Sequence, residues 1–129
     1  DLERMHLWIS EHTGLHERFI TLPGDDSFLC EARRSLVVGY KAILHRPDFL
    51  PEWYDKMQRV YGVDTAQARC GNVYVLAHDM YHQRRDAMIR VNPPADYRLY
   101  ELNQLDAKRV DPSKILHQEG GIILMKFGQ

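Results

Sequence analysis

Proline and glycine residues break this chain of 129 residues into segments that limit the length of every helix and strand. Proline lacks a backbone donor and glycine favours turns, so each cluster ends the element before it. In chain order the breaks are Gly14, Pro23-Gly24, Pro47, Gly62, Gly71, Pro93-Pro94, Pro112 and Gly120-Gly121. No apolar run between them approaches the roughly 18–20 residues that span a bilayer, so we expect no membrane partner.

The apolar periodicity between these breaks predicts an α+β fold that is mainly helical, with about five helices and one or two short strands. The predicted helices cover residues 2–11, 28–46, 51–61, 73–89 and 97–110. The predicted strands cover residues 18–22 and 122–127. Polar residues 25–27 supply the expected cap of the second helix.

The length of the chain suits one domain that covers residues 1–129. We find no internal repeat, low-complexity tract or linker that would divide it. The sequence begins with Asp1 and has no signal-peptide layout, so we expect a domain excised from or processed out of a longer chain.

Charge and cysteine content restrict the partners and the compartment. The chain has 17 basic and 18 acidic residues, without the basic excess of a protein that binds the phosphate backbone, so we expect no nucleic-acid partner. Its two cysteines, Cys30 and Cys70, form no CxxC motif, which favours a reducing compartment such as the cytoplasm.

One segment carries residues with a specific chemistry. His78 and His82 are four positions apart on the predicted helix 73–89, so their side chains lie one above the other, about 6 Å apart. Two imidazoles placed in this way can both bind one tetrahedral zinc ion at about 2.0–2.1 Å. Asp79 follows His78 directly, at the position of a general base for metal-bound water.

The segment 75–83 resembles the motif helix of zincin metallopeptidases, in which the pattern is HExxH. The resemblance implies a third, acidic zinc ligand on a following helix. Glu101, 19 residues after His82, is the first candidate and Asp106 is the second. Asp86, one turn beyond His82, is an alternative ligand or an orienting carboxylate.

The sequence departs from the zincin pattern at Asp79, where the family has glutamate. The side chain is one methylene shorter, which holds the carboxylate farther from metal-bound water and weakens proton transfer. The resemblance therefore predicts a zinc-dependent hydrolase, a small peptidase acting on peptide or protein substrates, in which metal binding survives better than turnover.

A second resemblance gives a non-enzymatic alternative. Residues 31–44 resemble the Leu-Tyr-Arg segment of LYR-motif assembly proteins, with Gly39 and Lys41 in place of the leucine and the arginine. This resemblance implies a helical interaction module that binds a protein partner without a metal. The sequence leaves both alternatives open.

Overall fold

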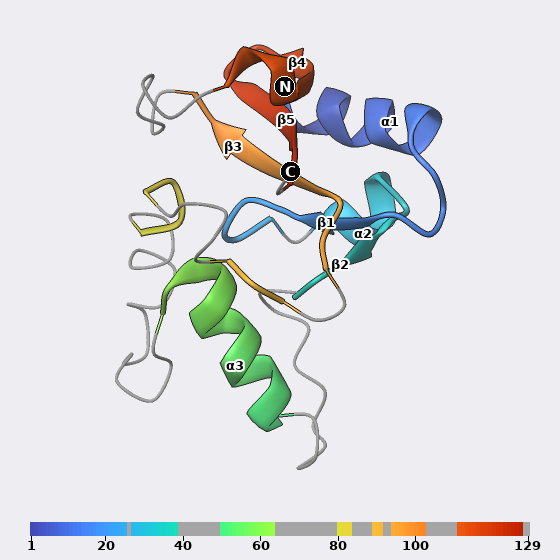
Figure 1. The fold of residues 1–129 in the computed structure, drawn as a ribbon. Coiled ribbons are helices and arrows are strands. Elements are labelled where there is room, and N and C mark those ends of the chain that lie inside the picture. Colours follow the sequence, from blue (N-terminus) through green and yellow to red (C-terminus); the bar gives the residue numbers. More distant parts are fainter. Residues whose placement is uncertain are drawn as a thin grey trace.

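The computed structural model describes residues 1–25, 27–38, 50–63, 80–83, 89–91, 94–102 and 111–127 (Figure 1). In these ranges the α-helices are α1 (Leu2–His12), α2 (Phe28–Glu31) and α3 (Leu50–Tyr61). The strands are β1 (Arg18–Ile20), β2 (Ser35–Leu36), β3 (Tyr97–Glu101), β4 (Ile115–Glu119) and β5 (Ile122–Lys126), and a short 3-10 helix, η3 (Pro112–Lys114), precedes β4. No helix in these ranges is long and apolar enough to cross a membrane.

The five strands form one mixed sheet in the order β2-β1-β3-β5-β4. β1 pairs in parallel with β2 and with β3, so Phe19 lies beside Leu36 on one side and beside Tyr97 on the other. β3 and β5 are antiparallel, as are β5 and β4. A tight turn at Gly120-Gly121 joins β4 to β5, with Gly120 at a φ of 56° that suits glycine.

Helices cover both faces of the sheet. α1 and α2 lie on one side, where the Phe19 and Phe28 rings are 5.4 Å apart and the Trp8 ring stacks on His117 of β4 at 4.1 Å. α3 lies on the other side (Figure 1). There Tyr61 donates a hydrogen bond to the Thr21 carbonyl at 3.1 Å.

Four local predictions are confirmed. The helices expected at 2–11 and 51–61 are α1 and α3, and the strands expected at 18–22 and 122–127 are β1 and β5. In each case a glycine or proline residue marks an end of the segment, and a clear apolar pattern within the segment predicts its type. Strands β2 and β4 were not predicted.

The prediction of a mainly helical fold with about five helices is wrong, because a five-stranded mixed sheet is the centre of the domain. The predicted helix 97–110 begins instead as strand β3, and residues 103–110 lie outside the described ranges. β3 is buried on both faces between β1 and β5, so it lacks the alternation of a half-exposed strand. The pattern of its apolar and aromatic residues therefore also fitted the spacing expected for the apolar face of a helix.

The predicted helix 28–46 is right for residues 28–31, which form α2, and wrong for residues 32–38. α2 ends after Glu31, and Arg33 adopts a φ of 55°, a left-handed conformation that stops a helix. The chain then enters β2. The helix implied by the LYR-like resemblance is therefore absent from residues 32–38, while Gly39 and Lys41 lie outside the described ranges.

Candidate functional site

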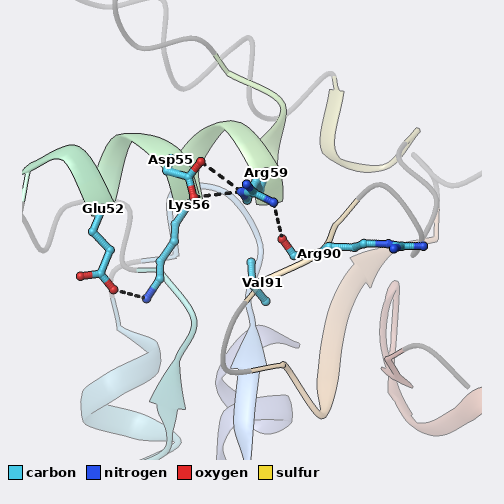
Figure 2. Close-up of a pocket in the computed structure, with 6 residues that line it drawn as sticks. All are labelled: Glu52, Asp55, Lys56, Arg59, Arg90 and Val91. Atoms are coloured by element: carbon cyan, nitrogen blue, oxygen red, sulfur yellow. Dashed lines mark hydrogen bonds and ion pairs between the residues drawn. The ribbon is translucent and has the colours of Figure 1, made fainter.

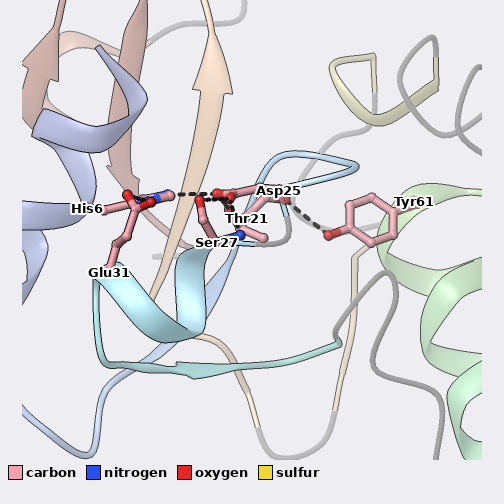
Figure 3. Close-up of polar contacts among 6 residues, drawn as sticks. All are labelled: His6, Thr21, Asp25, Ser27, Glu31 and Tyr61. Atoms are coloured by element: carbon pink, nitrogen blue, oxygen red, sulfur yellow. Dashed lines mark hydrogen bonds and ion pairs between the residues drawn. The ribbon is translucent and has the colours of Figure 1, made fainter.

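A buried histidine is the centre of a polar cluster in the described structure. His6 lies on the inner face of α1 and is completely buried. Its Nε2 is 2.7 Å from Asp25 Oδ2, and its Nδ1 is 3.0 Å from Glu31 Oε2 (Figure 3). Carboxylates only accept hydrogen bonds, so an imidazole between two of them donates from both nitrogens and carries a positive charge.

The loop after β1 holds Asp25 in place. Thr21 Oγ1 donates to Asp25 Oδ2 at 2.7 Å, and the Ser27 amide and hydroxyl lie 3.3 Å from Oδ1. Burial alone would raise the pKa of Asp25, but the hydrogen bonds from His6 and Thr21 outweigh it and lower that pKa. Burial is the largest single influence on His6 and lowers its pKa, but the hydrogen bonds and charges of Asp25 and Glu31 together outweigh it and raise that pKa.

This cluster of His6, Asp25 and Glu31 lies at the carboxyl end of β1. In open α/β sheets, ligands bind outside the carboxyl ends of parallel strands, where the connections leave to opposite sides. β1 has parallel neighbours on both sides and so fits this position. In this cluster, however, the carboxylates and the imidazole are hydrogen-bonded to one another rather than directed at a ligand. The cluster therefore fixes α1 and α2 together and makes the adjoining surface rigid.

A cavity of about 550 Å³ opens beside this cluster. Its lining residues come from α1 and the loop after it (Leu7, Ser10 and Leu15) and from the segment that ends α2 (Glu31, Arg33 and Arg34). Cavities of roughly 300–1,000 Å³ are the usual size for ligand sites. Glu31 belongs to both features, since it lines the cavity and also binds His6.

Arg34 makes one wall of the cavity rigid. Its guanidinium is buried and donates to the carbonyls of Ser10 and Thr13 at 2.9 and 2.7 Å, and to Thr13 Oγ1 at 3.0 Å. These carbonyls lie at the C-terminus of α1, where helices leave acceptors unsatisfied and favour a cation. Arg34 therefore has a structural role as the cap of α1.

The rim of the cavity is different, because its side chains point to solvent. Leu7 is 57% exposed and Leu15 is 73% exposed. Arg33 is exposed too, and within the described ranges its guanidinium makes no hydrogen bond or ion pair. The cavity thus offers two apolar side chains and one cation to a ligand.

A second, smaller groove of about 320 Å³ lies between α3 and residues 90–91 (Figure 2). Lys56 pairs with Glu52 at 3.1 Å, and Arg59 pairs with Asp55 at 2.9 Å. Arg59 also donates to the Arg90 carbonyl at 3.5 Å. Exposed pairs of this kind, four residues apart on a helix, contribute only a few tenths of a kcal/mol. The α3 charges of this groove are therefore paired within the helix, and we propose no ligand for it.

Two of the predicted zinc ligands, His82 and Glu101, are neighbours through the backbone of Glu101. His82 is buried in a turn after the helical residues Met80 and Tyr81, and its Nε2 accepts a hydrogen bond from the Glu101 amide at 3.0 Å. That bond uses the Nε2 lone pair, and the proton of the neutral ring is then on Nδ1, so His82 would have to release the Glu101 amide before it could bind a metal. The remaining predicted residues, namely His78, Asp79, Asp86 and Asp106, lie outside the described ranges. Within those ranges no group of three or more His, Cys, Asp or Glu side chains is arranged to hold a metal ion.

The sequence did not predict the His6 cluster. Its three members are separated by up to 25 residues, and Asp25 was interpreted as part of a helix cap. One signal was available, because His6 shares the apolar face of α1 with Met5 and Ile9. A histidine on a buried helix face needs hydrogen-bond partners from elsewhere in the chain.

Comparison with known proteins gives one match. The family model described as "Domain of unknown function (DUF6798)" matches residues 1–60, which is just under half of the chain. No curated protein and no solved structure matches the chain. The matched segment contains both the His6 cluster and every described residue that lines the larger cavity.

Proposed function

We propose that this domain is a protein-binding module, and that a segment of a partner protein lies in the cavity between α1 and residues 31–34. The observation that carries the proposal is the exposure of Leu7 and Leu15 at the rim of a cavity of about 550 Å³. Apolar side chains that project around a concave surface are typical of interaction sites. A partner larger than the cavity would cover them, whereas a small molecule inside it would leave them in water.

The polar residues of the cavity support binding rather than catalysis. Glu31 is bonded to His6, and Arg34 is bonded to the carbonyls of α1. A group that transfers protons must instead exchange a hydrogen bond with its substrate. These side chains give the surface a fixed shape, which lowers the entropy that a partner loses on binding.

Selection from a random dodecapeptide display library tests the proposal. We expect the wild-type domain to enrich peptides whose affinity falls about tenfold or more in the Leu7→Ser/Leu15→Ser variant, because each leucine loses apolar contact. Leu116→Ser is the matched control, since Leu116 is 38% exposed on β4 and does not line the cavity. Failure to enrich peptides, or binding that is unchanged by the double substitution, would contradict the proposal.

A zinc-dependent hydrolase is our second candidate, supported by the spacing of His78 and His82 in the sequence. In this proposal His78, His82 and Glu101, or Asp106 in place of Glu101, hold the ion. Imidazole and carboxylate groups suit zinc, which supplies an activated water for hydrolysis. Asp79 would accept the proton of that water.

Zinc content measured by mass spectrometry tests this second candidate. We expect about one zinc ion per chain, and loss of the metal in His78→Ala but not in the control His117→Ala. If zinc is present, Asp79→Glu should raise turnover of an unfolded protein substrate, because the longer side chain reaches metal-bound water. A wild-type protein without zinc, or unchanged zinc content in His78→Ala, would exclude this candidate.

A further inference from the structure

We infer that the partner segment is acidic, and that Arg33 binds a carboxylate of this segment while Leu7 and Leu15 contact its apolar residues. The inference rests on the proposed function and adds the chemical class of the partner. Three features of Arg33 carry it: its backbone conformation, its position on the cavity and the charges around it.

The backbone at Arg33 is held in an unfavourable conformation. Its φ is 55°, at the position after the Ala32 C-cap of α2 where helices most often have glycine. A side chain in this region costs energy, and such residues persist where the surrounding structure fixes them. Here the preceding helix is tied to α1 through Glu31, and β2 pairs with β1 two residues later. The Arg33 side chain therefore projects from a turn that neighbouring elements hold on both sides.

The charges around the cavity make Arg33 its available cation. Among the described residues, Glu31 is the only carboxylate that lines the cavity, and its Oε2 is bonded to His6. Arg34 directs its donors to backbone carbonyls. The Arg33 guanidinium makes no such contact within the described part of the chain, and it presents a planar fork that matches a carboxylate.

The apolar rim completes the chemistry of the partner. Leu7 and Leu15 line the same cavity as Arg33, so a bound segment meets apolar surface and positive charge together. A segment in which Asp or Glu lies among large apolar residues satisfies both. A basic segment would place its charge against Arg33 and bind more weakly.

Peptides selected from the dodecapeptide library test the inference. We expect them to be enriched in Asp and Glu and depleted in Lys and Arg relative to the input library. For an acidic peptide, Arg33→Gly should weaken binding about five- to tenfold at low salt, and the effect should shrink as salt rises. The same peptide with amides in place of its carboxylates should bind wild type and Arg33→Gly equally.

Further variants distinguish loss of the inferred Arg33 contact from a general effect of charge or of folding on the affinity. Arg33→Lys keeps the charge but loses the planar fork, so its affinity should lie between that of wild type and that of Arg33→Gly. Lys126→Ala removes a cation that does not line the cavity and should leave the affinity unchanged. Arg33→Gly should be at least as stable as wild type, because glycine adopts the positive φ without strain.

The possible results distinguish the inference from the proposed function. If peptides need Leu7 and Leu15 but bind equally with carboxylates or amides, the inference is overturned and the protein-binding function remains. Equal binding of an acidic peptide to wild type and Arg33→Gly overturns it as well. If no peptide depends on the two leucines, the proposed function itself fails.

Discussion

His6→Ala is expected to destabilise the domain by about 3–5 kcal/mol, a large fraction of the roughly 5–15 kcal/mol that stabilises an ordinary domain. The substitution leaves the buried Asp25 carboxylate without the imidazole that lies 2.7 Å away. It also separates α1 from Glu31 of α2 and leaves a cavity where the ring packs edge-on against Phe28. Urea denaturation followed by circular dichroism measures the change.

A second histidine provides the control for this experiment. His16 is exposed in the turn before β1, so His16→Ala should change the free energy of unfolding by less than about 0.5 kcal/mol. Equal effects of the two substitutions would show that the His6 cluster does not fix α1 and α2 together.

The second large effect expected is a dependence of stability on pH. The raised pKa of His6 means that the stability from its charge is fully present below about pH 6.5 and is lost as pH rises through the folded-state value. The lowered pKa of Asp25 means that its contribution is fully present above about pH 3.8 and is lost as pH falls through the folded-state value. Both contributions are therefore complete between these limits.

Urea midpoints measured from about pH 3 to pH 9 should decline on both sides of this window. The variant His6→Leu/Asp25→Leu is the comparison, because it removes both titrating groups and places apolar side chains in the buried site. Its midpoints should vary less with pH than those of wild type. Parallel profiles for the two proteins would mean that neither group is linked to folding as we describe.

Glycine breaks and apolar periodicity in the sequence predicted the elements whose ends and type depend on neighbouring residues. α1 ends shortly before Gly14 and α3 ends just before Gly62, and each has one apolar face that the sequence displays. β5 is an apolar run directly after the turn at Gly120-Gly121. For these segments, the glycine break and the hydrophobic pattern predict the same element that is present in the folded domain.

The failures come from interactions between distant segments. β3 is a strand because β1 and β5 lie on either side of it, and a strand covered in this way does not show alternation. α2 stops early because Arg33 takes a left-handed conformation, which glycine or asparagine would have indicated but arginine does not. The cavity depends on both α1 and this turn, so it could not be located before the turn was known.

The central position of β1 has a consequence for how the family match is interpreted. Residues 1–60 supply β1 and β2, while β3, β4 and β5 all come from residues 97–126. In a fragment of residues 1–60, the edge of β1 that pairs with β3 in the whole domain would lack its neighbouring strand. The family match at residues 1–60 therefore ends inside a single folding unit. The cavity surface within the matched residues depends on strands β3, β4 and β5, which come later in the chain.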